Sequence, residues 1–168
     1  MIISQDAHTI AAYIPHLRRY ARALTGDATT ADDLVQDTLE RAWKRFSLWR
    51  PGSDLRPWLF TIMHNIFVND VRAKPRNQPS RSAVEITVAA PQEERLKLRD
   101  LNRALRELSP EQREVVLLIG LEQMSYEEAA KILGIPIGTV MSRLSRGREQ
   151  LRTIINGTSA ASQLKVIK

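Results

Sequence analysis

The segment at residues 125–152 constrains the fold of this chain more than any other part of its sequence. Ser125, followed three residues later by Glu128, has the pattern of a capping box, which predicts the start of a short helix. Gly134 comes after that helix, and glycine readily adopts the left-handed backbone that a tight turn needs. A longer helix is predicted next, over residues 137–152. Two helices joined by so short a turn form a helix-turn-helix.

The longer predicted helix is strongly basic, since it holds several arginines and one acidic residue, Glu149. A helix-turn-helix leaves its second helix exposed. The first turns would therefore project short hydroxyls and guanidinium groups, which suit base edges in the major groove of a duplex. The candidate base-reading residues are Thr139, Ser142, Arg143 and Arg146, and the candidate phosphate contacts are Arg148 and Arg152. The alternative is a plain helical hairpin with a solvated basic face.

Helical periodicity also runs through residues 8–74, where apolar side chains recur at helical spacing. Residues 75–94 lose this period and contain three prolines, as a linker would. The period returns with a series of leucines, namely Leu96, Leu98, Leu101, Leu105 and Leu108. The sequence therefore predicts an all-α chain of two small helical domains, the second containing the helix-turn-helix. Their predicted bounds are 8–74 and 95–155, with a flexible linker at 75–94 and a tail of unknown structure at 156–168.

A helix in the first domain has two distinct faces. It is predicted to begin near Thr30, as an N-cap followed by acidic residues that complement the helix dipole. Its predicted inward face is apolar and consists of Val35, Leu39, Ala42 and Phe46. Its outward face is polar and consists of Asp33, Gln36, Asp37 and Glu40.

Aromatic residues, namely Phe46, Trp49 and Trp58, flank a loop that contains Pro51 and Gly52. The helix that follows carries amides and cations beside them, and such a mixture can stack on and hold an unpaired nucleic-acid strand. The candidate residues for this role are Trp49, Trp58, His64, Asn65, Asn69, Arg72 and Lys74. Without further information, burial in the core is the simpler interpretation of most of these aromatics.

Several functional classes find no support in the sequence. The chain has no cysteine, its three histidines are dispersed, and no glycine loop for phosphates is present, so no metal site and no cofactor are expected. No paired carboxylates or nucleophile with its base can be recognised, which argues against an enzyme, although a site assembled only in space would escape this test. A long apolar run and a secretory signal are also missing, and we expect a cytoplasmic protein.

Three segments resemble a known family in the correct order. Ala31-Asp32-Asp33-Leu34-Val35-Gln36-Asp37-Thr38-Leu39-Glu40-Arg41-Ala42-Trp43 is similar to the polymerase-binding helix of extracytoplasmic-function sigma factors. Pro57-Trp58-Leu59-Phe60-Thr61-Ile62-Met63-His64-Asn65 resembles their promoter-melting helix. Gly138-Thr139-Val140-Met141-Ser142-Arg143-Leu144-Ser145-Arg146-Gly147-Arg148 resembles their terminal recognition helix. The resemblance spans about residues 10–153.

The resemblance implies a transcription initiation factor whose two domains have different tasks. The first domain would bind core RNA polymerase through Asp33, Gln36, Asp37 and Glu40, and capture an unpaired base of the minus-10 promoter element near the loop at 47–55. The second domain would read the minus-35 element as duplex. The implied partners are bacterial core RNA polymerase, promoter DNA and an anti-sigma factor, often membrane-anchored, with no small-molecule substrate and a monomeric free chain.

Two other classes of protein remain as alternatives. A sigma-like mimic would titrate an anti-sigma factor without touching DNA, but such a protein is expected to lose the basic recognition helix. A helix-turn-helix repressor would use its first domain for dimerisation, but a dimer seam should be more apolar than the face at residues 33–40. Met141 stands where some members of the family place an arginine, which leaves open which minus-35 sequence is read.

Overall fold

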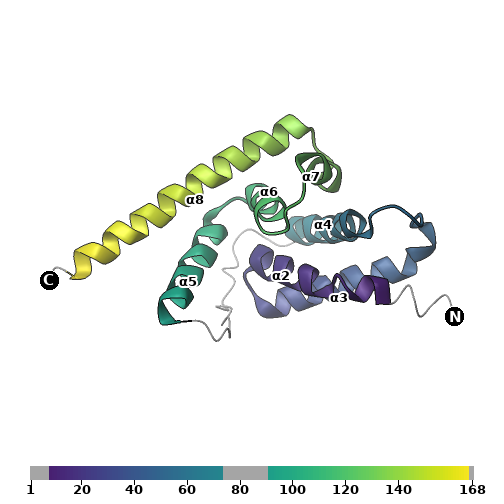
Figure 1. The fold of residues 1–168 in the computed structure, drawn as a ribbon, viewed down its shortest axis with the longest axis horizontal. Coiled ribbons are helices and arrows are strands. Elements are labelled where there is room, and N and C mark those ends of the chain that lie inside the picture. Colours follow the sequence, from purple (N-terminus) through teal and green to yellow (C-terminus); the bar gives the residue numbers. More distant parts are fainter. Residues whose placement is uncertain (1–7, 74–90, 167–168) are drawn as a thin grey trace.

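The computed structural model describes residues 8–73 and 91–166. Within these ranges the chain forms helices and no strand, which confirms the prediction of an all-α protein (Figure 1). The first half contains α2 (Ile14–Thr25), α3 (Ala28–Lys44), the 3-10 helix η1 (Phe46–Leu48) and α4 (Leu55–Ala73). The second half contains α5 (Gln92–Glu107), α6 (Pro110–Gly120), α7 (Tyr126–Leu133) and α8 (Ile137–Val166).

The turn between α2 and α3 differs from the sequence-based expectation. Gly26 ends α2 in the left-handed conformation, with φ of 70°. Asp27 then caps α3, because its carboxylate accepts hydrogen bonds from Thr30 N at 2.8 Å and Thr30 Oγ1 at 2.6 Å. The helix therefore begins at Ala28, and the prediction that Thr30 is its N-cap is wrong: the better acceptor, a carboxylate, stands three residues earlier.

The core of the first half is built from α2, α3 and α4. Tyr20 of α2 and Phe60 of α4 pack edge to face, with ring centroids 5.1 Å apart. Of the predicted inward face of α3, Val35 and Ala42 are buried, whereas Leu39 and Phe46 are partly buried against the core. This packing turns the opposite face of α3 outward.

The helix that opens the second half begins earlier than predicted and is less buried. α5 starts at Gln92, so residues 92–94 of the expected linker are helical. Of its leucine series, Leu105 and Leu108 are buried, but Leu96, Leu98 and Leu101 are exposed by 52%, 37% and 39%. Figure 1 shows the reason, since the start of α5 extends away from α6 and the first half. Linker residues 75–90 lie outside the described residues.

The helix-turn-helix is confirmed in detail. Ser125 Oγ accepts from Glu128 N at 3.1 Å, and Glu128 Oε2 accepts from Ser125 N at 2.7 Å, which completes the capping box of α7. Gly134 closes α7 with φ of 63°, as the turn requires. α8 then runs without interruption to Val166, so the predicted tail at residues 156–168 is helical as far as Val166.

α8 packs closely on α6 at one glycine. Gly147 is buried, and a Cβ placed there would lie 2.8 Å from Cγ2 of Val116 on α6. A larger residue would therefore push the two helices apart. The glycine sets the distance at which α8 crosses α6, and with it the position of the basic residues on α8.

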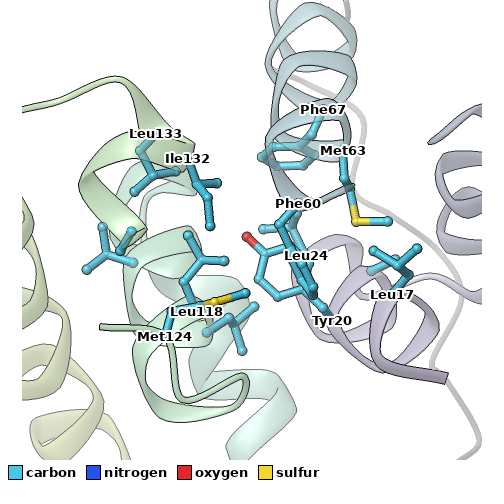
Figure 2. Close-up of a cluster of buried hydrophobic side chains, with 14 of the residues drawn as sticks. Leu17, Tyr20, Leu24, Phe60, Met63, Phe67, Leu118, Met124, Ile132 and Leu133 are labelled. Atoms are coloured by element: carbon cyan, nitrogen blue, oxygen red, sulfur yellow. The ribbon is translucent and has the colours of Figure 1, made fainter. Parts of the chain in front are cut away.

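The two halves pack against each other. α2 contacts α6, and α4 contacts α7. Figure 2 shows Leu118, Met124 and Ile132 of the second half on one side of this boundary, with Tyr20, Phe60 and Phe67 of the first half on the other. All of these residues belong to one hydrophobic cluster and are buried.

Candidate nucleic-acid interface

One face of α8 packs against the rest of the protein. Val140, Leu144, Gly147 and Leu151 are buried, and their spacing of four, three and four residues places them on one side of a helix with 3.6 residues per turn. Much of the remaining circumference of α8 is exposed. The six candidate side chains on this helix must lie on that part.

The candidates occupy two flanks rather than one stripe. At about 100° per residue, one flank carries Thr139, Arg143 and Arg146, and the other carries Arg148 and Arg152. Between the flanks, opposite the buried face, lie the exposed residues Ser142, Ser145 and Glu149. Near its start, the helix thus has the small side chains of Ser142 and Ser145 between the cationic flanks, which suits a helix start that enters a groove between two phosphate backbones.

The candidate side chains on α8 differ in their exposure and in the contacts that they already make. Arg146 and Arg148 are exposed. Arg152 is exposed but lies 3.6 Å from Glu149, and Ser142 Oγ donates to Thr139 O at 3.2 Å. These contacts are local and at the surface, so they can exchange for contacts with a ligand at little cost.

Arg143 faces the boundary between the halves and is partly buried. Burial raises the pKa of Glu114 on α6, and the hydrogen bond with His64 and the positive charge of Arg143 act against this increase. Arg143 is therefore close enough to interact with the carboxylate, unlike Arg146 one turn later.

The candidates on α4 fall on different faces. Asn65, Asn69 and Arg72 are exposed and, at spacings of four and three residues, share one face of the helix. His64 lies elsewhere, because its Nδ1 is 2.6 Å from Glu114 Oε1 and its side chain is only 15% exposed. In this arrangement the exposed face offers two amides and a cation to a ligand, whereas His64 is occupied by the second half. Lys74 lies outside the described residues.

The aromatic residues of the first half form a partly buried cluster. The ring centroid of Phe46 is 5.3 Å from that of Trp49 and 6.4 Å from that of Trp58. Trp49 Nε1 is buried and has no hydrogen-bond partner among the described residues. The cluster lies beside the loop at residues 50–54, which is exposed throughout. The tryptophans therefore support this loop and still present part of their surface.

The outward face of α3 forms a second candidate surface. Asp33, Gln36, Asp37 and Glu40 are all exposed, and Glu40 Oε1 accepts from Lys44 Nζ at 2.6 Å. Trp43 lies seven residues after Gln36, hence on the same face, and is 49% exposed. Sequence reasoning did not single out this tryptophan as part of the surface. The available signal was its spacing from Gln36, together with its place outside the apolar period.

Other types of site have no counterpart in the residues that the structure describes. Within residues 8–73 and 91–166, no three histidine, aspartate or glutamate side chains are grouped as metal ligands. In the same ranges, none of the helices combines the length and apolar character that would span a membrane.

Comparison with protein families gives one match in each half. The model for the sigma2 domain of PhyR matches residues 10–64, and the model for region 4 of sigma-70 matches residues 98–151. The first match covers α2, α3 and the beginning of α4, and the second covers most of α5 to α8. The outward face of α3 lies within the first match and the α8 candidates up to Arg148 lie within the second. Arg152 and the exposed face of α4 lie just beyond the matched segments.

Individual proteins resemble the chain across both halves. It is 40% identical over 149 residues to the ECF RNA polymerase sigma factor EcfG of Rhodopseudomonas palustris, an alignment that covers 87% of this chain and 82% of that protein. Among solved structures, the sigma factor RpoE from Bartonella quintana, in complex with the anti-sigma factor NepR, has a TM-score of 0.76 and 38% identity, with coverage of 89% and 96%. CnrH in complex with the cytosolic domain of CnrY has a TM-score of 0.68 and 28% identity, with coverage of 90% and 88%.

Proposed function

The chain belongs to the extracytoplasmic-function sigma factors of RNA polymerase, and from this premise we propose how its surfaces divide the work of promoter recognition. The central observation is the capped helix-turn-helix, which leaves α8 exposed with cations on both flanks. A sigma-like mimic has no need of such a helix. In addition, the similarity to EcfG extends over both halves, as expected of a sigma factor rather than a repressor with an unrelated first domain.

The outward face of α3 is the proposed contact with core RNA polymerase. Its side chains are exposed and carry three carboxylates, namely those of Asp33, Asp37 and Glu40. Trp43 adds an exposed aromatic surface to the same face, and tryptophan is enriched among the residues that dominate protein interfaces. An acidic face with one large aromatic anchor fits a basic groove with an apolar centre.

The basic flanks of α8 are the proposed contact with the minus-35 duplex. Thr139, Ser142, Arg143 and Arg146 would approach base edges, while Arg148 and Arg152 would bind phosphates. Arg146 is the strongest candidate for a base contact, because it is exposed and lies near the start of the helix. Arg143 would have to give up its proximity to Glu114.

The exposed face of α4 and the tryptophans beside the loop at residues 50–54 are the proposed contacts with the minus-10 element. Asn65, Asn69 and Arg72 would bind the melted strand, and Trp49 and Trp58 would shape the place where an unpaired base stacks. His64 and Lys74 complete this proposed set, His64 only if Glu114 releases it. Capturing an extruded base offsets a few kcal/mol of unstacking, so binding alone shifts the equilibrium toward open DNA. No covalent step and no cofactor are required.

An anti-sigma factor is the second proposed protein partner. RpoE, which resembles this chain over most of its length, is seen in complex with the anti-sigma factor NepR, and CnrH is seen in complex with the cytosolic domain of CnrY. A protein that covers the outward face of α3 or the flanks of α8 would prevent initiation. The chain would act in the cytoplasm, where polymerase and chromosome are found.

In vitro transcription tests the proposal. Purified chain is added to bacterial core polymerase on a pool of promoter fragments, with core polymerase alone as the control. New start sites that require the chain are expected. Asp37→Arg should abolish them by placing a cation on the α3 face, whereas Asp100→Arg, the same charge change at an exposed position on α5, should not. Equal activity of both variants would contradict the assignment of α3, and no start sites with any variant would contradict the function.

A further inference from the structure

A buried carboxylate joins the two halves of the chain. Glu122 lies between α6 and α7, and its side chain is completely buried. Its Oε1 accepts from Arg19 of α2, at 3.2 Å from Nε and 3.0 Å from Nη2. Its Oε2 lies 2.9 Å from Arg56 Nη2 on α4 and 3.2 Å from His16 Nδ1 on α2. All three partners belong to the first half, so both carboxylate oxygens are satisfied only while the halves are together.

Further polar contacts cross the same boundary. Arg56 Nη2 also donates to the backbone carbonyl of Glu122. Glu114 Oε1 on α6 is 2.6 Å from His64 Nδ1 on α4. Arg113 Nη1 donates to Leu24 O near the end of α2, at 2.8 Å. We call this set of contacts, centred on Glu122, the interdomain latch.

The latch and the apolar boundary have different physical tasks. Burial of apolar side chains such as Leu118, Met124 and Phe60 provides a driving force for closure that does not depend on exact register. A buried charge, in contrast, is tolerated only when it is paired and hydrogen-bonded. Glu122 thus restricts the closed state to the one arrangement in which Arg19, Arg56 and His16 all reach its carboxylate.

The closed arrangement is too short to read a promoter. α7 packs on both α4 and α8, and neighbouring helix axes lie about 8–10 Å apart, so α8 passes within roughly 20 Å of α4. The elements centred at minus 35 and minus 10 are about 25 base pairs apart, or about 85 Å along B-form DNA at 3.4 Å per step. The halves must therefore separate before both elements can be bound. The seventeen residues at 74–90 permit this, because an extended chain of that length spans up to about 60 Å.

Closure leaves the proposed polymerase contact accessible. The outward face of α3 is exposed, whereas His64 on α4 and Arg143 on α8 are drawn into the boundary. In the closed chain, α3 can therefore still bind polymerase. The minus-35 and minus-10 elements, however, cannot be bound at the same time.

We propose that the interdomain latch is an autoinhibitory contact: Glu122 holds the free sigma factor closed, and the chain opens after it has docked on core polymerase through α3. This inference rests on the proposed function for its second step only. The first step, a closed free chain held by Glu122, concerns the isolated protein.

The distance between the halves can be measured directly in the full chain. The natural sequence contains no cysteine, so Arg18→Cys on α2 and Lys131→Cys on α7, both at exposed positions, provide two unique sites for spin labels. Double electron–electron resonance should give one short distance for the parent chain. Glu122→Gln keeps the size of the side chain but removes its charge, and should raise the ratio of open to closed molecules about tenfold or more, seen as a long, broad distance distribution.

Two comparisons protect this reading. Arg56→Gln removes a partner of Glu122 that belongs to the first half, and should produce the same long distances. Circular dichroism reports whether each variant keeps its helices. Glu127→Gln removes an exposed carboxylate from α7, outside the boundary, and should leave the short distance unchanged. A parent chain that is already open, or folded Glu122→Gln and Arg56→Gln chains that stay closed, would overturn the latch.

Addition of core polymerase tests the second step. The short distance in the parent chain should be replaced by a long one as polymerase binds. Binding with an unchanged short distance would overturn the proposed opening. Failure to bind at all would refute the proposed function, and with it the opening on polymerase, but the distances in the free chain would still decide whether Glu122 holds the halves together.

Discussion

Gly147 provides the sharpest test of how the structure positions the proposed DNA-binding helix. In an exposed helix, replacing glycine by alanine stabilises by about 1 kcal/mol. Here, however, the new Cβ would lie 2.8 Å from Cγ2 of Val116 and 3.6 Å from Cβ of Gln112. Overpacking of this kind typically costs about 1–3 kcal/mol. Gly147→Ala should therefore leave the free energy of unfolding unchanged or lower it by up to about 2 kcal/mol, where propensity alone would raise it.

A double-mutant cycle separates the clash from the propensity. Val116→Ala removes the atom that the new Cβ meets, at the cost of some apolar contact. In that background Gly147→Ala should become stabilising by up to about 1 kcal/mol, which gives a favourable coupling of about 1 kcal/mol or more between the two sites. For a chain of this length, 1 kcal/mol corresponds to roughly 2–4 °C in Tm, measurable by calorimetry or by circular dichroism.

The proposed clash is contradicted if the changes in the free energy of unfolding caused by Gly147→Ala and Val116→Ala are additive. If the two substitutions add within about 0.5 kcal/mol, α8 and α6 do not meet as closely as described, and Gly147 does not set their separation. Gly157, which has no neighbour within 4 Å of a placed Cβ, is the matched control. There alanine should show only the gain in helix propensity.

Three further outcomes are expected. Arg146→Ala should weaken binding of a minus-35 duplex by about 1–3 kcal/mol in fluorescence anisotropy, and an affinity equal to that of the parent chain would remove Arg146 from the set of base contacts. Asp27→Ala should lower the free energy of unfolding by about 1 kcal/mol through loss of the α3 cap, whereas Thr29→Ala should cost less; the reverse order would place the cap elsewhere. Burial raises the pKa of Glu114 above its usual 4.5, so the folded chain retains a proton that the unfolded chain releases, and this contribution to stability declines as the pH rises from 4.5 through the raised pKa. Urea unfolding near pH 5 and at about pH 8 should therefore show that Glu114→Gln gains stability relative to the parent as the pH rises; a difference that does not depend on pH would argue that this carboxyl titrates normally.

Local structure in the second half was predictable because its signals are local. The pair of Ser125 and Glu128 and the turn at Gly134 specify the start and the end of α7 through contacts within a few residues of sequence. The start of α3 was misplaced for an equally local reason. Both Asp27 and Thr30 can cap a helix, and only the structure shows that the carboxylate of one accepts from the other.

The extent of burial was harder to infer. Leu98 and Leu101 follow the same helical period as Leu105, yet only Leu105 lies where α5 meets the rest of the chain. Periodicity shows which face of a helix is apolar, but not how far along that face a neighbour extends. The continuation of α8 past residue 155 has no capping or apolar signal that would have revealed it.

The contacts between the halves could not have been found from sequence. Glu122 and Arg19 are 103 residues apart, and either would ordinarily be assigned to a solvated surface. Their pairing depends on how two domains, which residues 74–90 connect in the sequence, pack against each other. The candidate surfaces themselves, in contrast, follow from single helices, which is why the faces of α3 and α4 could be assigned from spacing, apart from His64.

The apolar boundary drawn in Figure 2 also limits how such a chain can be improved. Side chains such as Met124 and Phe60 are buried at this boundary, so a substitution that packs it better is expected to raise the melting temperature of the closed protein. Under the proposed opening on polymerase, the same substitution would make separation of the halves harder. Selection for thermal stability and selection for activity therefore oppose each other at this boundary. Packing of intermediate strength is the expected compromise.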